Sequence, residues 1–170
     1  MKRGTLYFFC GKMGAGKTTR SRTLAGKENA VLISEDEWLS TLYPNQIESF
    51  SDYRRYSSIL KPLVFSHVEN LLKTGSNVVL DFPANTVEQR KWFSELASTA
   101  GAPSKMIYIK ASDATCLQQI AKRRIEQPER AIFDTRSVFE QVNKFFQEPG
   151  EAEKLNIQVV ESNPSPQPRK

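Results

Sequence analysis

The residues from 11 to 18 read Gly-Lys-Met-Gly-Ala-Gly-Lys-Thr, which fits the pattern G-x-x-x-x-G-K-S/T of a phosphate-binding loop. An apolar run, residues 6–10, precedes it, and residues 19–25 after it can form a helix, as this loop requires. Glycines let such a backbone curl with its N–H groups around one centre, and the helix N-terminus adds positive potential there. A plain glycine-rich turn is the alternative. The complete pattern in this context favours a nucleoside triphosphate site.

The pattern also gives the loop residues their roles. Lys17 can reach the β- and γ-phosphate oxygens, and the Thr18 hydroxyl can bind the Mg²⁺ that bridges them. The sequence therefore predicts ATP or GTP with Mg²⁺ as ligands. The residues expected to contact the nucleotide are Gly11, Lys12, Met13, Gly14, Ala15, Gly16, Lys17, Thr18 and Thr19.

Length and composition predict one ordinary globular domain. The chain has 170 residues, 39% of them hydrophobic and 25% charged, enough for a substantial core without disulfides. Cys10 and Cys116 lack CxxC spacing and are expected to be unpaired thiols in a cytoplasmic protein. No run approaches the roughly 20 apolar residues of a membrane span, so no membrane partner is expected.

The net charge of +5 leaves a nucleic-acid partner open without favouring one. Part of that charge lies in Arg169 and Lys170, and enzymes that handle phosphate need cations in any case. The chain has no long basic block, and its aromatic residues do not alternate with Arg or Lys as in proteins that stack single strands.

Short apolar runs recur with room for a helix between them, which predicts an α/β fold in three layers, a parallel five-stranded sheet with helices on both faces. These runs are residues 6–10, 31–34, 78–80, 106–109 and 157–160. Helical spacing predicts the longest helix over residues 52–73, with Pro62 kinking or dividing it. The single histidine, His67, falls on the apolar stripe of this helix and is expected to pack rather than to bind a metal.

The other helices are predicted over residues 86–100, 113–126 and 137–146, with an irregular stretch at 127–136. Residues 162–170 are polar and rich in proline, so we expect a disordered tail there. The folded domain is accordingly expected to span residues 1–161.

Two acidic residues stand where predicted strands end. Asp81 closes the run 77–81, and Asp36 follows the run 31–34. Ligands of open α/β sheets bind at the carboxyl ends of the strands, so both carboxylates are expected near the loop. Asp81 is predicted to join Thr18 at the Mg²⁺ site, and Asp36 to orient and deprotonate an attacking hydroxyl.

Each carboxylate also has a simpler interpretation. Asp81 could belong to a turn that leads into Pro83. Residues 34–37, Ser-Glu-Asp-Glu, fit a capping box in which Ser34 caps a helix and Asp36 only complements its dipole. The two interpretations of Asp36 can hold together, and which aspartate is the general base stays open.

A cluster of cations predicts a mobile segment over residues 113–136 that covers the phosphates. It contains Lys122, Arg123, Arg124, Arg130 and Arg136. Phosphoryl transfer spreads negative charge over equatorial oxygens, and an arginine brought over them stabilises that charge. Arg124 is the leading choice, with Arg123 and Arg130 next, although a solvated helix face would also carry such charges.

Four segments in this order resemble the kinase branch of the P-loop NTPases, whose members are often labelled "ATP-binding protein" or "AAA family ATPase". They are residues 11–18, Ile-Ser-Glu-Asp at 33–36, Val-Val-Leu-Asp at 78–81, and the Arg-containing stretch 117–124. The branch is similar to the kinase domains of polynucleotide kinases, to chloramphenicol phosphotransferase and to zeta toxins. The resemblance covers residues 4–160.

The resemblance implies a five-stranded parallel sheet of kinase type with a helical lid, and ATP with Mg²⁺ as cofactors. It also implies transfer of the γ-phosphoryl group to a hydroxyl. By position, Asp36 matches the family's catalytic base, Asp81 its second acidic residue and Arg124 its lid arginine. Polynucleotide kinases carry an arginine three residues beyond the catalytic aspartate, whereas this chain has Leu39 there.

The sequence therefore predicts a P-loop kinase that phosphorylates a hydroxyl of a small molecule, with Lys17, Asp36 and Arg124 as catalytic residues. A polynucleotide 5′-hydroxyl kinase is the alternative that the charge favours and Leu39 disfavours. A nucleotide-dependent ATPase or GTPase switch is the alternative outside the kinases.

Overall fold

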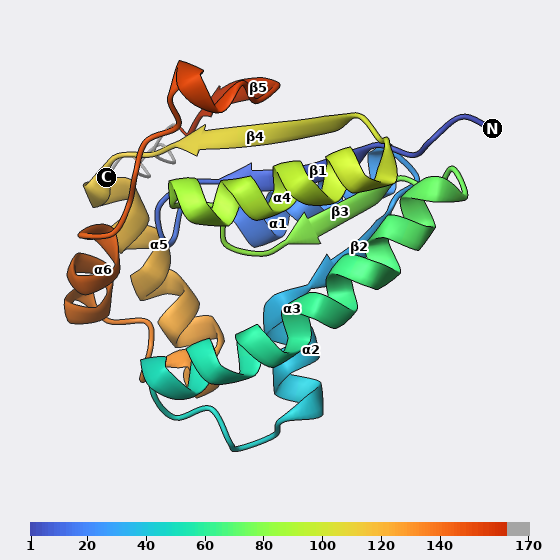
Figure 1. Ribbon diagram of the computed structural model, residues 1–170. Coiled ribbons are helices and arrows are strands. Elements are labelled where there is room, and N and C mark those ends of the chain that lie inside the picture. The colour runs from blue at the N-terminus through green and yellow to red at the C-terminus, as the bar shows by residue number, and fades with distance from the viewer. Residues whose placement is uncertain (163–170) are drawn as a thin grey trace.

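The computed structural model describes residues 1–162, and its centre is a five-stranded sheet in which every neighbouring pair of strands is parallel. The strand order is β2-β3-β1-β4-β5 (Figure 1). The α/β class and the five-stranded parallel sheet are confirmed. The strands are β1 (Leu6–Cys10), β2 (Val31–Ser34), β3 (Val78–Asp81), β4 (Ser104–Lys110) and β5 (Ile157–Glu161).

The predicted helices form with shifted ends. Pro62 does not divide the longest helix, which runs without interruption through it, and the last helix ends at Asn143, three residues before the predicted end. The irregular stretch contains a short 3-10 helix, η1 (Pro128–Arg130), and a second, η2 (Glu151–Glu153), precedes β5. The α-helices are α1 (Lys17–Lys27), α2 (Glu35–Leu42), α3 (Phe50–Lys73), α4 (Val87–Ala100), α5 (Asp113–Glu126) and α6 (Arg136–Asn143).

The helices cover both faces of the sheet, as predicted, because successive strand residues point to opposite sides. Phe8 of β1 packs toward α3 and α4, where its ring stacks on Phe93 at 4.2 Å between centroids. Its neighbour Phe9 packs on the other face with Cys116 and Ile120 of α5. The two cores hold the sheet rigidly, so the loops at its carboxyl edge have fixed starting points.

A fully buried arginine on α4 connects the last part of the chain to this framework. Arg90 donates from Nε and Nη2 to the carboxylate of Glu153, at 2.7 and 3.2 Å, and from Nη1 to the carbonyl of Ala84 at 3.0 Å. A bidentate pair of this kind fixes direction as well as distance. It holds η2, just before the edge strand β5, against the loop that follows β3.

The structure also bears on the predictions for the cysteines, the histidine and the C-terminal tail. Cys10 and Cys116 are both free and buried, as expected. His67 is exposed on α3, so its predicted packing role is wrong; the core-facing positions of that turn are Val64 and Val68. The predicted tail lies, apart from residue 162, outside the described residues. No helix within residues 1–162 is long and apolar enough to cross a bilayer.

Candidate active site

The glycine-rich loop leads into α1, which begins differently from the other α-helices of residues 1–162. Its N-cap is Gly16, in the left-handed region at φ 96°, and no side chain caps it. The other five are capped by Ser34, Ser49, Thr86, Ser112 and Thr135. No acceptor within the described chain takes the amide hydrogens of Gly14, Gly16, Lys17 or Thr18. These amides are therefore free to bind an anion.

Two of the glycines are required by the packing around the loop. A Cβ on Gly14 would lie 2.6 Å from the carbonyl oxygen of Cys116, and the φ of +80° at this position already disfavours other residues. A Cβ on Gly11 would lie 2.9 Å from the carbonyl oxygen of Ile109. The amide of Gly11 donates to Oδ1 of Asn85 at 3.0 Å. Sequence patterns did not identify Asn85, which holds the start of the loop from the β3–α4 connection.

Lys17 lies folded into the loop. Its ammonium donates to the carbonyl of Gly11 and, at 3.0 Å, to that of Lys12. It forms no ion pair with a carboxylate within residues 1–162. Burial lowers its pKa to about 8. Within residues 1–162 only carbonyl groups accept hydrogen bonds from this ammonium, and Asp81 acts on it from a distance, so a bound phosphate would be a stronger partner.

The carboxylates predicted at the strand ends come together beside the loop. Ser34 and Asp81 are partners in the β2–β3 register, which puts the ends of these strands next to each other. Burial, and then the nearby charge of Asp36, raise the pKa of Asp81, while the Thr18 hydroxyl and the Lys17 ammonium lower it. Thr18, Lys17 and Asp36 are therefore each close enough to Asp81 to change its pKa.

Thr18 and Asp81 are a small set of oxygen donors, and the described residues hold no group of three or more His, Cys, Asp or Glu side chains that could bind a metal. Mg²⁺ keeps several waters and usually takes only one or two protein oxygens together with substrate phosphates. The two residues fit such an ion and would not form a cage for a metal bound by protein alone.

Asp36 lies in the first turn of a capped helix and also has an accessible carboxylate. Ser34 caps α2 by accepting from the amide of Glu37 at 3.3 Å, so the helix start is confirmed, and Asp36 stands in its first turn. Its side chain is 63% exposed and has a single ion-pair partner within residues 1–162, Arg130, at 3.4 Å. Helix capping accounts for Ser34 and leaves the carboxylate of Asp36 accessible.

The three arginines proposed for the lid have different surroundings. Arg123 makes a bidentate pair with the buried Asp134, at 2.8 and 2.5 Å. Arg130 lies between Asp134 and Asp36, 3.4 Å from each. Arg124 is exposed and forms no ion pair with any described residue. The structure thus connects the segment after α5 to Asp36 through Arg130, whereas Arg124 is the arginine left free.

Asp134 was not identified from the sequence, because an aspartate in an irregular stretch has no pattern to distinguish it. Replacing it with alanine removes the carboxylate that Arg123 and Arg130 share. We expect the segment from η1 to α6 to lose about 2 kcal/mol of local stability, since hydrogen bonds between charged groups contribute about that much. Hydrogen exchange should then accelerate over residues 127–136 and stay unchanged in β1. Equal protection in both proteins would contradict this role.

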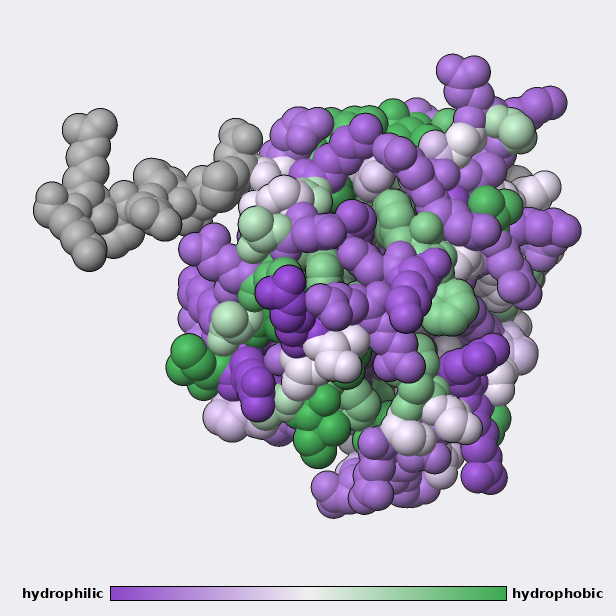
Figure 2. Space-filling view, turned by 90° about the vertical axis from the view of Figure 1, so that its left-hand side faces the viewer, coloured by the Kyte–Doolittle hydropathy of each residue, from purple (hydrophilic) through white to green (hydrophobic). Residues whose placement is uncertain are grey.

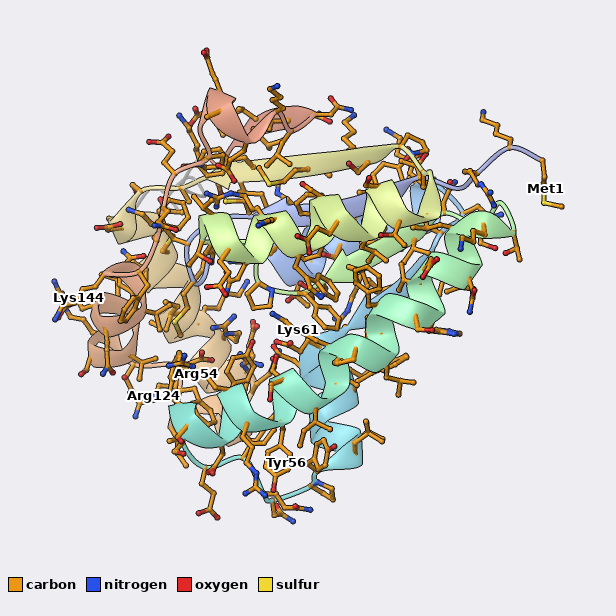
Figure 3. The ribbon with its side chains drawn as sticks, viewed as in Figure 1. Met1, Arg54, Tyr56, Lys61, Arg124 and Lys144 are labelled. Atoms are coloured by element: carbon orange, nitrogen blue, oxygen red, sulfur yellow. The ribbon has the colours of Figure 1, made fainter. Side chains whose placement is uncertain are left out.

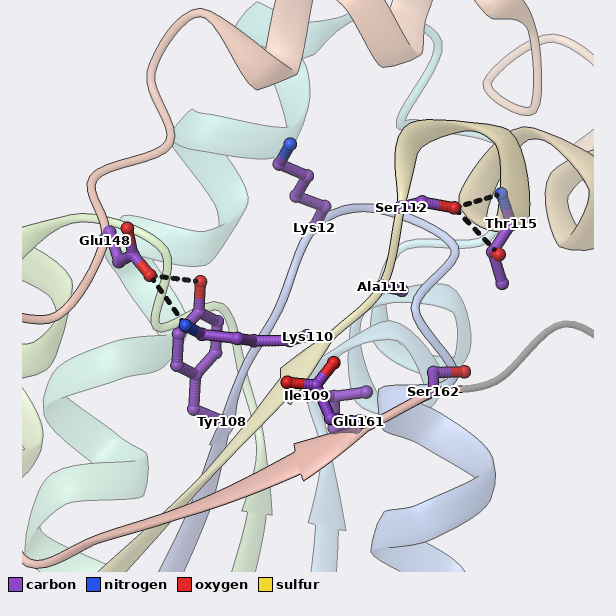
Figure 4. Close-up of a pocket in the computed structure, with 10 residues that line it drawn as sticks. All are labelled: Lys12, Tyr108, Ile109, Lys110, Ala111, Ser112, Thr115, Glu148, Glu161 and Ser162. Carbon is purple, nitrogen blue, oxygen red and sulfur yellow. Dashed lines mark hydrogen bonds and ion pairs between the residues drawn. The ribbon is translucent and has the colours of Figure 1, made fainter.

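An open pocket of about 390 Å³ lies beside the loop, at the carboxyl ends of β4 and β5. Lys12 reaches it from the loop, Ser112 and Thr115 from the start of α5, and Glu161 from the end of β5 (Figure 4). Its volume is within the range of small-molecule sites. Figure 2 shows the face of the molecule on the α5 and α6 side as mainly hydrophilic, with hydrophobic side chains standing apart from one another.

Solved structures with the same fold include several kinases. A protein from Chloroflexus aurantiacus proposed to be a kinase shares 21% identity at a TM-score of 0.71, over 95% of this chain and 86% of that one. The APS kinase CysC of Mycobacterium tuberculosis, in complex with AMPPNP and APS, shares 18% identity at a TM-score of 0.62, covering 97% of this chain and 92% of that one. Kti12 of Chaetomium thermophilum, in complex with ADP-AlF3, shares 21% at 0.65, covering 92% and 88%.

At these identities the likeness establishes the fold. None of the curated proteins gives a significant match to the chain. The AAA domain family, by contrast, matches residues 6–149, from the first residue of β1 to beyond α6. That match covers most of the chain and includes the loop, both strand-end aspartates and the arginine segment. The chain therefore belongs to the AAA domain family of P-loop proteins and has a kinase-like fold, as the resemblance predicted.

Proposed function

We propose that this protein is an ATP-dependent kinase that transfers the γ-phosphoryl group of ATP to a hydroxyl of a small molecule. The observation that carries the proposal is the pairing of two features at one end of the sheet. The amides of Gly14, Gly16, Lys17 and Thr18 have no acceptor within residues 1–162, and beside them stands the exposed carboxylate of Asp36. A site for nucleotide hydrolysis or switching needs only the free loop amides. Phosphoryl transfer to a hydroxyl also uses a carboxylate such as that of Asp36.

In this proposal the loop amides and Lys17 bind and orient the triphosphate. Lys17 would exchange its contacts with the carbonyls of Gly11 and Lys12 for phosphate oxygens. Thr18 and Asp81 would hold Mg²⁺, which, when bound, neutralises charge on the β- and γ-phosphates. Positioning and charge stabilisation together account for most of the catalysis of phosphoryl transfer.

Asp36 would act on the acceptor. Its carboxylate accepts the hydroxyl proton while the hydroxyl oxygen bonds to the γ-phosphorus and the bond from that phosphorus to the β,γ-bridging oxygen breaks. The bond electrons leave with ADP. Arg124, which forms no ion pair with any described residue, would steady the transferred group, with Arg123 and Arg130 as the next choices; Arg130 would first have to leave Asp36. The pocket beside Lys12 has room for the nucleoside part of ATP.

A polynucleotide acceptor is less well supported. Leu39, at the position where polynucleotide kinases carry an arginine, is 2% exposed and packs in the core. The α2 helix therefore offers no cation at that position for a nucleic-acid phosphate.

The test is a transfer assay with γ-labelled ATP and a panel of hydroxyl compounds, including sugars, sugar acids, nucleosides and a 5′-hydroxyl oligonucleotide. We expect label to appear in a small hydroxyl compound and ATP consumption to rise in its presence. Label that appears only in inorganic phosphate, at a rate that no compound changes, would support the nucleotide-dependent switch instead. Label in the oligonucleotide would support the polynucleotide kinase.

The lowered pKa of Lys17 predicts how nucleotide affinity depends on pH. A bound triphosphate favours the charged ammonium, so binding is coupled to proton uptake wherever the free protein has lost that proton. Below pH 8 Lys17 is already charged, and its contribution to affinity is constant. Above pH 8 the dissociation constant of AMP-PNP should rise, by up to about tenfold per pH unit.

Calorimetry in two buffers of different ionisation enthalpy measures that proton uptake directly. The Lys17→Arg protein is the matched control, because arginine keeps its positive charge over this pH range and has no proton to take up on binding. An affinity for AMP-PNP that stays flat above pH 8 in the wild-type protein would contradict the assignment.

A further inference from the structure

Lys61 is a half-buried cation close to the proposed catalytic site. It extends from α3 toward α4, and its ammonium lies 5.6 Å from the centroid of the Trp92 ring (Figure 3). Its charge acts on Glu35, the residue directly before Asp36. The face of Trp92 attracts the ammonium but accepts none of its three N–H groups in an ordinary hydrogen bond. The ammonium is thus held in place with its donors available.

The carboxylates of Glu35 and Asp36, near Lys61, already have other partners. Glu35 is 2% exposed and accepts from the hydroxyls of Tyr53 and Ser57, the second at 2.7 Å. Asp36 pairs with Arg130. Within residues 1–162 Lys61 has no carboxylate within 4.0 Å and no hydrogen-bond acceptor. A partly desolvated ammonium without an acceptor is unfavourable, and an oxyanion of a ligand would supply one.

Arg54 adds a second cation on the same helix. It precedes Lys61 by seven residues, close to two helical turns, so both side chains leave α3 on the same side. Figure 3 shows both on the opposite side of α3 from Tyr56. Arg54 is exposed and forms no ion pair with a described residue. One face of α3 therefore presents two cations without carboxylate partners next to the segment that holds Asp36.

We propose that the phosphoryl acceptor carries an oxyanion, a phosphate or carboxylate group, which Lys61 binds with Arg54 as the second cation. The proposal rests on the proposed function, because it names the class of compound whose hydroxyl Asp36 would activate. The carboxylates of Glu35 and Asp36 would keep that oxyanion on the α3 side of the site. The acceptor hydroxyl would then lie toward the loop.

Trp92 is the reporter for the test. The chain has two tryptophans, so the Trp38→Phe protein leaves Trp92 as its single source of indole emission, directly beside the Lys61 ammonium. Inorganic phosphate is titrated into this protein with saturating AMP-PNP and Mg²⁺, which occupy the glycine-rich loop. We expect a saturable change in emission. When the Lys61→Met substitution is combined with Trp38→Phe, the phosphate affinity should fall by about tenfold or more, since a charge-assisted contact is lost.

Three further proteins make the titration specific. Lys61→Arg should retain phosphate binding, and Arg54→Met should weaken it less than Lys61→Met does. Lys27→Met, an exposed lysine in the last turn of α1, removes the same charge far from the site and should change nothing. Circular dichroism checks that each variant is folded. An emission response that is absent, or equal with and without Lys61, overturns the anion site.

Matched pairs of compounds distinguish the two kinds of oxyanion. Ribose 5-phosphate is compared with ribose, and gluconate with glucose, by the same emission change. At least one charged member should bind about tenfold or more tightly than its neutral partner, and that member identifies phosphate or carboxylate. Equal affinities within both pairs would overturn the proposal. If the unsubstituted protein does not bind AMP-PNP, the proposed kinase function is wrong. If it binds AMP-PNP but the emission change does not depend on Lys61, only the proposed anion site is wrong.

Discussion

The Asp36→Asn protein is expected to bind AMP-PNP with Mg²⁺ as tightly as the unsubstituted protein and to transfer phosphate about 10² to 10⁴ times more slowly. The amide has nearly the shape of the carboxylate but cannot accept the hydroxyl proton, and general-base catalysis contributes about that factor. Asp36 lies outside the glycine-rich loop and is 63% exposed, so neither the phosphate site nor the fold depends on it. Single-turnover transfer of label from ATP measures the effect.

The exposed Glu37 provides the control. It stands in the same first turn of α2, so Glu37→Gln removes the same charge from the helix dipole without removing the proposed base. If Asp36 only complemented the dipole, the two variants would show equal and small effects. Transfer by Asp36→Asn at close to the unsubstituted rate would remove the assignment and favour Asp81 as the base.

The Lys17→Ala protein should lose both tight AMP-PNP binding and turnover, with the rate falling about 10²- to 10³-fold. Removing one preorganised donor from developing negative charge has an effect of that size. The expected change differs from that of Asp36→Asn because, in the proposed function, Lys17 contacts the nucleotide both before and during transfer. Calorimetry with AMP-PNP and the rate of label transfer separate the two effects.

Folding should not suffer from this substitution. Burial lowers the pKa of Lys17 to about 8 from its ordinary value of 10.5, so the folded state disfavours the ammonium relative to the unfolded chain. The buried Lys17 ammonium therefore lowers the free energy of unfolding by its full amount below pH 8. This destabilisation decreases as the pH rises from 8 toward the pKa of lysine in the unfolded chain. At neutral pH Lys17→Ala should keep or raise the free energy of unfolding in denaturant titrations. A protein that had become unstable would not test the phosphate contact. Lys27→Ala, at the other end of α1, is the matched control for binding and turnover.

Much of the fold followed from local patterns. The strand segments and the cap at Ser34 depend on residues near one another in the chain, so they could be predicted. The course of α3 was less certain, since Pro62 removes one hydrogen bond. The uninterrupted helix forms because Leu60 and Val64 on either side of it are buried in the core. For His67 the predicted packing in the core was wrong, because a helical period does not define which edge of an apolar stripe faces water.

The glycine-rich loop was determined by the sequence alone, because its function needs only backbone amides, one lysine and one hydroxyl at fixed spacing. The positions of Asp36 and Asp81 at one sheet edge also followed, since parallel strands bring their carboxyl ends together. What surrounds them was decided by the tertiary structure. Arg130 reaches Asp36 across 94 positions of sequence, and Lys61 meets Trp92 through the packing of α3 on α4. Such contacts depend on how whole helices pack against the sheet, which no local pattern of residues encodes.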